Sequence, residues 1–315
     1  MADSKYILEI KNLCQHFTSG RGHNKLLVKA VDDVSFGVKP AETFGLVGES
    51  GCGKTTTGRT IIRLYNPTSG EMYFNGRDIA APMTNDLRKY LTDNIAMIFQ
   101  DPIESLNPRM TIEEIVGEGL RVRGLKDKAE VRARVHEMLE KVGLTEEHAT
   151  RYPHEFSGGQ RQRIGIARAM IIQPKMIIAD EPVSALDVSI QAQVINLLND
   201  LKQEMGLTIL FIAHNHSVVK YFSDRIGVMY YGHLVEIARG DDLYKKPLHP
   251  YTKALLSAIP EPNPITEKTR QRVDYDPQRD HDYSVEQPSM VEVEPEHFVY
   301  CSPSELAQYQ KQLRQ

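Results

Sequence analysis

A glycine-rich segment near the amino terminus combines residue types that bind phosphate groups. It fits the pattern GxxxxGK[ST], follows the short apolar run 43–47 and precedes a helical pattern. Glycines let such a loop curl so that backbone N–H groups converge on phosphate oxygens, and the helix N-terminus adds partial positive charge. We expect Lys54 to reach the β- and γ-phosphates and the Thr55 hydroxyl to bind Mg²⁺. The residues expected to touch the nucleotide here are Gly48, Glu49, Ser50, Gly51, Cys52, Gly53, Lys54, Thr55 and Thr56.

Two adjacent acids form a second candidate for chemistry. The apolar run 176–179 has the length of a strand and ends in Asp180 and Glu181. An Asp at the carboxyl end of a strand can hold Mg²⁺ through water, and a neighbouring Glu can polarise a water for in-line attack on a γ-phosphate. With the phosphate loop, this pair predicts hydrolysis of a nucleoside triphosphate.

Four further features narrow the function, because many unrelated NTPases share a phosphate loop. They are Gln100 at the end of the apolar run 95–99, the turn Ser157-Gly158-Gly159-Gln160 before a helical pattern, the segment 184–187 ending in Asp187, and His214 at the end of the run 207–213. Together with the phosphate loop and the acidic pair, they resemble the ATP-binding subunit of an ABC transporter over about residues 5–260.

The resemblance implies an α/β fold of the P-loop NTPase class. We expect an ABC-type nucleotide-binding domain over residues 1–260, with a RecA-like core, an antiparallel β subdomain and a helical subdomain at about 101–170. Residues 261–315 would form a C-terminal extension that is partly irregular. That stretch is rich in prolines and acids at its start, so it could be poorly ordered or could lie extended on the main domain.

The resemblance also implies a role for each matching residue. Glu181, His214 and Gln100 would be catalytic, and Thr55, Gln100 and Asp180 would serve Mg²⁺. Ser157, Gly158, Gly159 and Gln160 would close on ATP held by a facing subunit, so that a head-to-tail dimer buries two nucleotides. Asp187 would couple the two sites. Phe17 would stack on adenine, although His16 could do so instead and Phe17 could be ordinary packing.

Three positions depart from the family pattern. Asn215 follows His214 where the family usually carries Asp, which leaves the tuning of His214 open. Phe156 replaces a commoner Leu without loss of a polar group. Ala41 replaces a usual Gly, which predicts that its turn needs no positive φ.

Two separated segments resemble the dipeptide, oligopeptide and nickel importer branch of the family. They are 100–110, which contains QDP and SLNPRM, and 249–260, which contains HPYTKALL and IP. The branch implies an ATPase that energises uptake of oligopeptides, or of dipeptides or nickel, at the cytoplasmic face of a bacterial membrane. Its partners would be a related D-type ATP-binding subunit, two transmembrane permease subunits and an external peptide-binding protein. Relatives often carry a cysteine-rich iron–sulfur motif near the C-terminus, and with Cys301 alone there we expect no cluster.

Composition excludes several other classes. The 315 residues carry 38 Lys+Arg against 42 Asp+Glu, for a net charge of −4, which gives no support to a nucleic-acid partner. We find no membrane-spanning apolar run and no secretory signal. Cys14, Cys52 and Cys301 form no CxxC motif, which favours a reducing environment. Within the phosphate loop, we expect Cys52 to be a small side chain that fills space rather than a reactive thiol.

Three competing functions remain open. His214-Asn215-His216 also fits a nuclease or metal pair, but further ligands at suitable spacing are missing nearby. A soluble ABC ATPase of translation or DNA repair would usually carry a second cassette or an insert. A non-hydrolysing regulatory subunit would lack catalytic residues, and this chain has its own set.

Periodicity predicts several elements around these motifs. Apolar spacing indicates helices at 127–142 and 190–201, and a hairpin joins 226–230 to 234–238. Other predicted elements are an opening strand at 6–10, a surface loop at 18–27, a half-buried strand at 28–36 and a final helix at 303–312 capped by Ser302 or Ser304.

Overall fold

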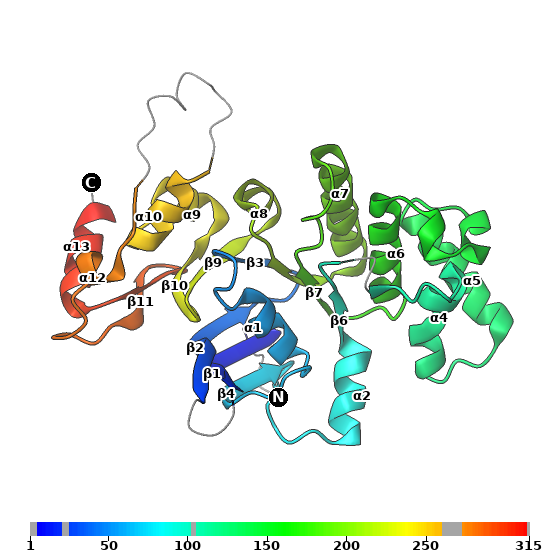
Figure 1. Cartoon of the computed structure of the whole chain (residues 1–315), viewed down its shortest axis with the longest axis horizontal. Helices are drawn as coiled ribbons and strands as arrows, with labels where there is room; N and C mark the ends of the chain where they lie inside the picture. The colour runs from blue at the N-terminus through cyan, green and yellow to red at the C-terminus, as the bar shows by residue number, and fades with distance from the viewer. Residues whose placement is uncertain (1–4, 21–24, 102–104, 260–272, 314–315) are drawn as a thin grey trace.

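Two β-sheets and the helices packed on them make up the fold (Figure 1). The computed structural model describes residues 5–20, 25–101, 105–259 and 273–313. The larger sheet has the strand order β11-β12-β10-β9-β3-β8-β7-β6, and the smaller has the order β2-β1-β4-β5. None of the helices in these ranges has both the length and the apolarity needed to cross a bilayer.

Five parallel strands form the centre of the larger sheet. They are β3 (Thr43–Val47), β6 (Ile95–Ile98), β7 (Met176–Asp180), β8 (Thr208–Ile212) and β9 (Arg225–Tyr230). Side chains alternate along each strand between two hydrophobic cores, one on each face of the sheet. On β8, for example, Ile209 and Phe211 pack into one core and Leu210 and Ile212 into the other. A sheet buried on both faces explains why these strands are short continuous apolar runs in the sequence.

The smaller sheet is antiparallel and lies against the phosphate-loop helix. Its strands are β1 (Leu8–Ser19), β2 (Leu26–Val38), β4 (Ser69–Phe74) and β5 (Arg77–Asp78), and helix α1 spans Lys54–Ile61. The predicted loop at 18–27 is wrong at both ends, because β1 and β2 stay paired up to Ser19 and Leu26. Residues 21–24 lie outside the described part of the chain.

A helical subdomain stands at one end of the larger sheet (Figure 1). Its main helices are α4 (Ile112–Val122), α5 (Lys128–Lys141) and α6 (Gly158–Met170), with short 3₁₀ turns at Glu146–Thr150 and Pro153–Glu155. The predicted helix at 127–142 is confirmed as α5, whose Val131 and Val135 are buried. Asp127 accepts hydrogen bonds from the first turn of α5, which explains where that helix begins.

The C-terminal residues extend the larger sheet. The predicted hairpin is confirmed, since β10 (His233–Arg239) pairs antiparallel with β9, and β12 (His297–Cys301) then pairs with β10. β11 (Ser289–Glu294) forms the edge. In its described part, this stretch thus contributes two strands to the larger sheet. The predicted domain boundary at residue 260 falls within residues 260–272, which lie outside the described part of the chain. That boundary therefore stays a prediction.

A buried carboxylate fastens this extension to the core. Glu236 on β10 accepts hydrogen bonds from the backbone N–H groups of Leu248 and His249, and from His297 Nε2 at 2.8 Å.

Ser302 caps the last helix, α13 (Pro303–Leu313), by accepting from the N–H of Glu305. The remaining helices are α2 (Asn85–Asn94), α7 (Val188–Met205), α8 (His216–Phe222), α9 (Gly240–Lys245), α10 (Pro250–Ser257) and α12 (Pro277–Asp280).

The turn before β3 contradicts one prediction. Ala41 has a φ of 57°, in the left-handed region that was expected to be unnecessary here. Its N–H donates to Thr208 Oγ1 at 3.0 Å, so a tertiary hydrogen bond holds the turn in this conformation. An alanine in this region costs roughly 1–2 kcal/mol relative to its preferred conformations.

Candidate functional site

A glycine stands at each end of the phosphate loop, Gly48 after β3 and Gly53 before α1. No other residue could replace either glycine without a clash. Gly48 and Gly53 have φ values of 149° and 109°, and a Cβ on either would lie 2.2 Å from a backbone oxygen, that of Met229 or of Ala30. Gly53 occupies the N-cap position of α1 and supplies no side-chain cap. The first N–H groups of the helix therefore stay available to an anion.

Lys54 lies inside this loop. Its Nζ donates to the carbonyl oxygens of Gly48 and Glu49, both at 2.8 Å, and the residue is buried. The ammonium group is thus held by the loop itself, at the point where phosphate oxygens would compete for it. Burial raises the pKa of the neighbouring Cys52 thiol, which argues against a reactive thiolate.

Thr55 and Asp180 meet beside the loop. The Thr55 hydroxyl donates to Asp180 Oδ1 at 2.8 Å, while Oδ2 is buried without a hydrogen-bond partner and lies 4.0 Å from Arg59 Nη2. Burial raises the pKa of Asp180, and the Thr55 hydrogen bond and the Arg59 charge oppose that rise. A hydroxyl beside a carboxylate oxygen with unused capacity offers the hard oxygen donors that Mg²⁺ prefers.

The second acid of the pair, Glu181, is contacted by the two remaining candidate catalytic side chains. Gln100 Nε2 donates to Glu181 Oε2 at 3.2 Å, and His214 Nδ1 lies 3.0 Å from the same oxygen. Glu181 has a φ of 47°, and its N–H donates to Ile212 O at 2.8 Å. Because parallel strands end at one edge of the sheet, the chain segments after β6, β7 and β8 meet there.

Asn215 has a clear structural role. Its Oδ1 accepts from the N–H groups of Ser217 and Val218, so it caps α8 directly after His214. Asp and Asn are both strong N-caps, which explains why the amide can stand in an otherwise acidic position. His216 is half-buried, and desolvation of its ring lowers its pKa to about 4. It does not converge on Glu181 with His214.

The Ser-Gly-Gly turn lies at the helical subdomain, away from α1 (Figure 1). Ser157 caps α6 in a reciprocal box with Gln160, with Ser157 and Gly158 exposed. Gly159 packs so closely on Ile190 of α7 that a Cβ would lie 2.6 Å from its Cγ2. Asp187 precedes α7 and is also exposed. The fold thus brings the Ser157 turn and the Asp187 segment together on the surface.

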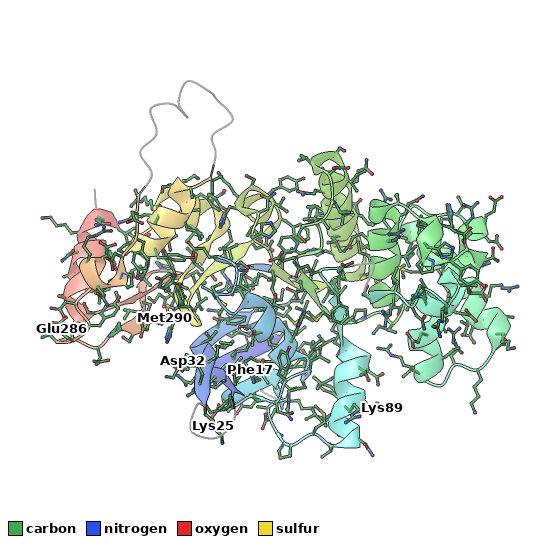
Figure 2. All side chains as sticks on the ribbon, in the orientation of Figure 1. Phe17, Lys25, Asp32, Lys89, Glu286 and Met290 are labelled. Carbon is green, nitrogen blue, oxygen red and sulfur yellow. The ribbon has the colours of Figure 1, made fainter. Side chains whose placement is uncertain are left out.

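The candidate adenine-stacking residues take opposite sides of β1. The ring of Phe17, labelled in Figure 2, is half-buried and meets Tyr65 edge-on with centroids 5.2 Å apart. His16 instead places Nε2 3.1 Å from Asp32 Oδ1. Neighbouring residues of a strand face opposite ways, and the engagement of His16 elsewhere favours Phe17.

One contact was missed by sequence reasoning. The hydroxyl of Tyr251 accepts from the N–H of Glu49 at 3.2 Å, so α10 touches the phosphate loop. A pocket of about 540 Å³ adjoins this contact, lined among others by His214, Tyr231 and Tyr275. The HPYTKALL segment was a signal for this contact, although the sequence indicated only a branch of the family.

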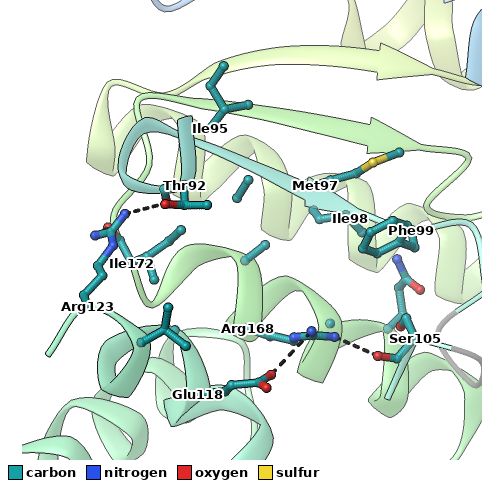
Figure 3. A pocket seen from close by; sticks show the side chains of 16 residues that line it. Thr92, Ile95, Met97, Ile98, Phe99, Ser105, Glu118, Arg123, Arg168 and Ile172 are labelled. Carbon is teal, nitrogen blue, oxygen red and sulfur yellow. Dashed lines mark hydrogen bonds and ion pairs between the residues drawn. The ribbon is translucent and has the colours of Figure 1, made fainter. Parts of the chain in front are cut away.

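A groove separates the end of the sheet from the helical subdomain (Figure 3). It has a volume of about 360 Å³, and β6, α4 and α6 line it. Its apolar wall includes Ile95, Met97 and Ile172, and Arg168 crosses it to reach Ser105 O at 2.7 Å and Glu118 at 3.5 Å. Phe99 also lines this groove and is followed directly by Gln100.

Comparisons with known proteins agree with this arrangement. The ABC transporter family model matches residues 31–184, and the model described as "Oligopeptide/dipeptide transporter, C-terminal region" matches residues 235–283. The oligopeptide transport ATP-binding protein OppF of Bacillus subtilis (strain 168) is 59% identical over 300 residues, covering 95% of this chain and 97% of the relative. The dipeptide transport ATP-binding protein DppF of Lactococcus lactis subsp. cremoris (strain MG1363) is 52% identical over 315 residues, covering 99% of each.

A solved structure shares the fold. The dimeric ATP-binding cassette MJ0796, in a post-hydrolysis state bound to ADP and Pi, superposes with a TM-score of 0.67 at 31% identity, covering 74% of this chain and 98% of that one. The expected α/β cassette fold is confirmed. The chain therefore belongs to the ABC transporter family of ATPases, in the branch of oligopeptide and dipeptide transport ATP-binding proteins.

Proposed function

We propose that this chain hydrolyses MgATP to energise the uptake of oligopeptides across a bacterial cell membrane, acting at its cytoplasmic face. The observation that carries the ATPase part is the convergence of Gln100 and His214 on one oxygen of Glu181. The cargo is inferred from the relatives, whose names state oligopeptide or dipeptide transport. The dipeptide name of the Lactococcus relative keeps dipeptides as a second cargo, and nickel is a third.

In this proposal the phosphate loop and Lys54 bind the β- and γ-phosphates. Thr55, Asp180 and Gln100 would hold Mg²⁺, which would neutralise the negative charge of the phosphates. Glu181 accepts a proton from the attacking water, and His214 orients that carboxylate and contacts the γ-phosphate. Phe17 stacks on adenine. The buried Asp180 oxygen without a partner supports the cation assignment.

The exposed turn at Ser157 supports a two-subunit arrangement. A helix N-terminus with exposed Ser157 and Gly158 can bind an anion, and its place away from α1 suits the ATP of a facing subunit. Asp187 lies on the same surface, which supports a role in coupling the two sites. We propose a related D-type ATP-binding subunit as the partner.

The groove in Figure 3 is the proposed docking site for the membrane subunits. An apolar wall with Arg168 and Glu118 at its side suits a short amphipathic cytoplasmic segment of a permease. Because Phe99 leads into Gln100, such a segment can sense the catalytic centre. The complex would comprise two permease subunits and an extracellular peptide-binding protein.

The test is to purify what binds the chain when hydrolysis is blocked. A tagged Glu181→Gln variant, extracted in detergent with ATP, should retain ATP and co-purify with two permeases, a related ATPase and a peptide-binding protein. Glu147→Gln, an exposed change in the helical subdomain, is the matched control and should turn over normally. Recovery of ribosomal or DNA-repair proteins without membrane proteins would refute the transport assignment and leave only the ATPase.

A further inference from the structure

A cluster of metal-ligand side chains lies on the antiparallel sheet, outside the ATP site. Cys14 and His16 are two residues apart on β1, and Asp32 is on the adjoining strand β2. Sγ of Cys14, Nε2 of His16 and a carboxylate oxygen of Asp32 all lie within 4.8 Å of one another. Figure 2 labels Asp32 on this part of the molecule.

The spacing of these atoms suits one cation between them. Asp32 Oδ1 lies 3.1 Å from His16 Nε2 and 3.8 Å from Cys14 Sγ. Ligand bonds of tetrahedral zinc imply separations of about 3.3–3.6 Å between such atoms. Small side-chain adjustments therefore suffice to bring all three onto one ion.

The candidate for a fourth ligand lies outside this group of three and approaches the other oxygen of Asp32. His233, at the start of β10, places Nε2 3.7 Å from Asp32 Oδ2. The backbone fixes this approach, since the N–H of Asp32 donates to Gly232 O at 2.9 Å. The ligand set is then one thiolate, two imidazoles and one carboxylate.

Neighbouring groups hold the ligand atoms in place, and solvent can reach them. The backbone N–H of Asp33 donates to Cys14 Sγ at 3.3 Å. Both oxygens of the Asp32 carboxylate are contacted, with Oδ2 3.0 Å from Lys29 Nζ and Oδ1 3.1 Å from His16 Nε2. The side chains of His16 and Asp32 are each 18% exposed, so solvent ions can reach them.

We propose that Cys14, His16, Asp32 and His233 form a binding site for Zn²⁺. A thiolate with imidazole ligands selects zinc over Mg²⁺ and Ca²⁺, which prefer oxygen ligands only. Lys29 Nζ, 3.0 Å from Asp32 Oδ2, occupies part of the carboxylate, but this lysine side chain is 55% exposed and can swing into water. The ion would tie β1, β2 and the β9–β10 turn together.

The site would adjoin the phosphate loop without belonging to it. The N–H of Gly232, the neighbour of His233, donates to Cys52 O at 2.9 Å. β1 also carries Phe17, one residue after His16. We therefore expect zinc to stiffen the support of the nucleotide site and to raise the unfolding temperature.

The experiment uses the full chain, stripped with chelator and titrated without nucleotide. Zn²⁺ should bind at one equivalent by calorimetry, and Co²⁺ should give the absorption band of a thiolate ligand. Cys14→Ser and His16→Gln should each weaken zinc binding by about tenfold or more, and Cys14→Ser should abolish the thiolate band. The controls are Cys301→Ser, and His136→Gln from a histidine–carboxylate pair with Glu146. Both should bind zinc as the parent chain does.

Two results would overturn the proposal. One is equal zinc affinity in the parent chain and in folded Cys14→Ser and His16→Gln, which would place the ion elsewhere. The other is the absence of stoichiometric zinc or of the thiolate band in the parent chain. If Cys14→Ser does not fold, Asp32→Asn takes its place, with the same weakening expected. Because ATP is left out, failure here says nothing against ATP hydrolysis.

Discussion

Glu181 and His214 lie 33 residues apart in sequence, yet Oε2 of the first is 3.0 Å from Nδ1 of the second. Each follows a strand of the parallel sheet, and the backbone of Glu181 is left-handed, with a φ of 47°. Gln100 completes the group from a third strand. A water placed for attack on a γ-phosphate would meet all three side chains together.

This contact predicts strong coupling between the two residues. His214→Ala should lower the rate of ATP hydrolysis by about 10²–10⁴-fold, the usual range for loss of acid–base assistance. Residues that act as a unit are not additive, so the double variant with Glu181→Gln should be little slower than the slower single variant. Steady-state phosphate release measures all three. Fully additive losses would show that the residues act independently.

The hydrogen bond from Glu49 N–H to Tyr251 predicts an effect of α10 on nucleotide binding. Tyr251→Phe removes the acceptor and keeps the ring, which packs against Tyr230 with centroids 4.4 Å apart. We expect ATP affinity to fall about fivefold, since one hydrogen bond is worth about 1 kcal/mol. Fluorescent ATP titration measures this. Tyr73→Phe, on the antiparallel sheet, is the control, and equal affinity of Tyr251→Phe and the parent would show that the loop needs no support here.

A buried ion pair predicts a large loss of stability. Arg225 Nε lies 2.6 Å from Glu42 Oε1, with side chains only 5% and 6% exposed. Glu42→Gln leaves the guanidinium without its charge partner and should lower the free energy of unfolding by about 3 kcal/mol. Urea unfolding measures the change. Glu130→Gln, which breaks the exposed pair with Arg134, should change it by less than about 0.5 kcal/mol, and similar losses in both variants would contradict the burial argument.

Buried histidines predict loss of stability in mild acid. Burial lowers the pKa of His249 to about 3, with smaller contributions from the charges of His281 and Lys253. Below the ordinary value of 6.5 the unfolded chain binds a proton that the folded ring refuses. The free energy of unfolding should therefore fall as pH falls from 6.5 toward 3, by about 1.4 kcal/mol per pH unit for this group.

The measurement for this prediction is urea unfolding at several pH values. His249 caps α10 by accepting from the N–H of Tyr251, and His249→Asn keeps a capping acceptor while removing the titration. Its stability should depend less steeply on pH than that of the parent chain. Parallel curves for the two proteins would show that His249 does not contribute to the acid sensitivity.

Local rules account for the elements that the sequence predicts correctly. The strand 43–47 is β3 with the same bounds, because a continuous apolar run before a glycine-rich loop suits a strand buried on both faces. The helix at 127–142 is α5 within one residue at each end, because its spacing and its Asp cap lie within a few turns of chain. The prediction for Ala41 is wrong because a distant residue, Thr208, holds that turn.

By itself, the sequence determined the chemistry available to this protein: the phosphate loop, the two acids, the Ser-Gly-Gly turn at Ser157 and the branch to which the chain belongs. Each depends on residues close together, whose conformations follow from φ preferences, capping and periodicity. The tertiary structure alone decided that Gln100 and His214 share one oxygen of Glu181, that Tyr251 reaches Glu49 across 202 residues, and that Cys14 faces Asp32. The physical reason is strand order and register, which are set by burial over the whole sheet rather than by any local segment.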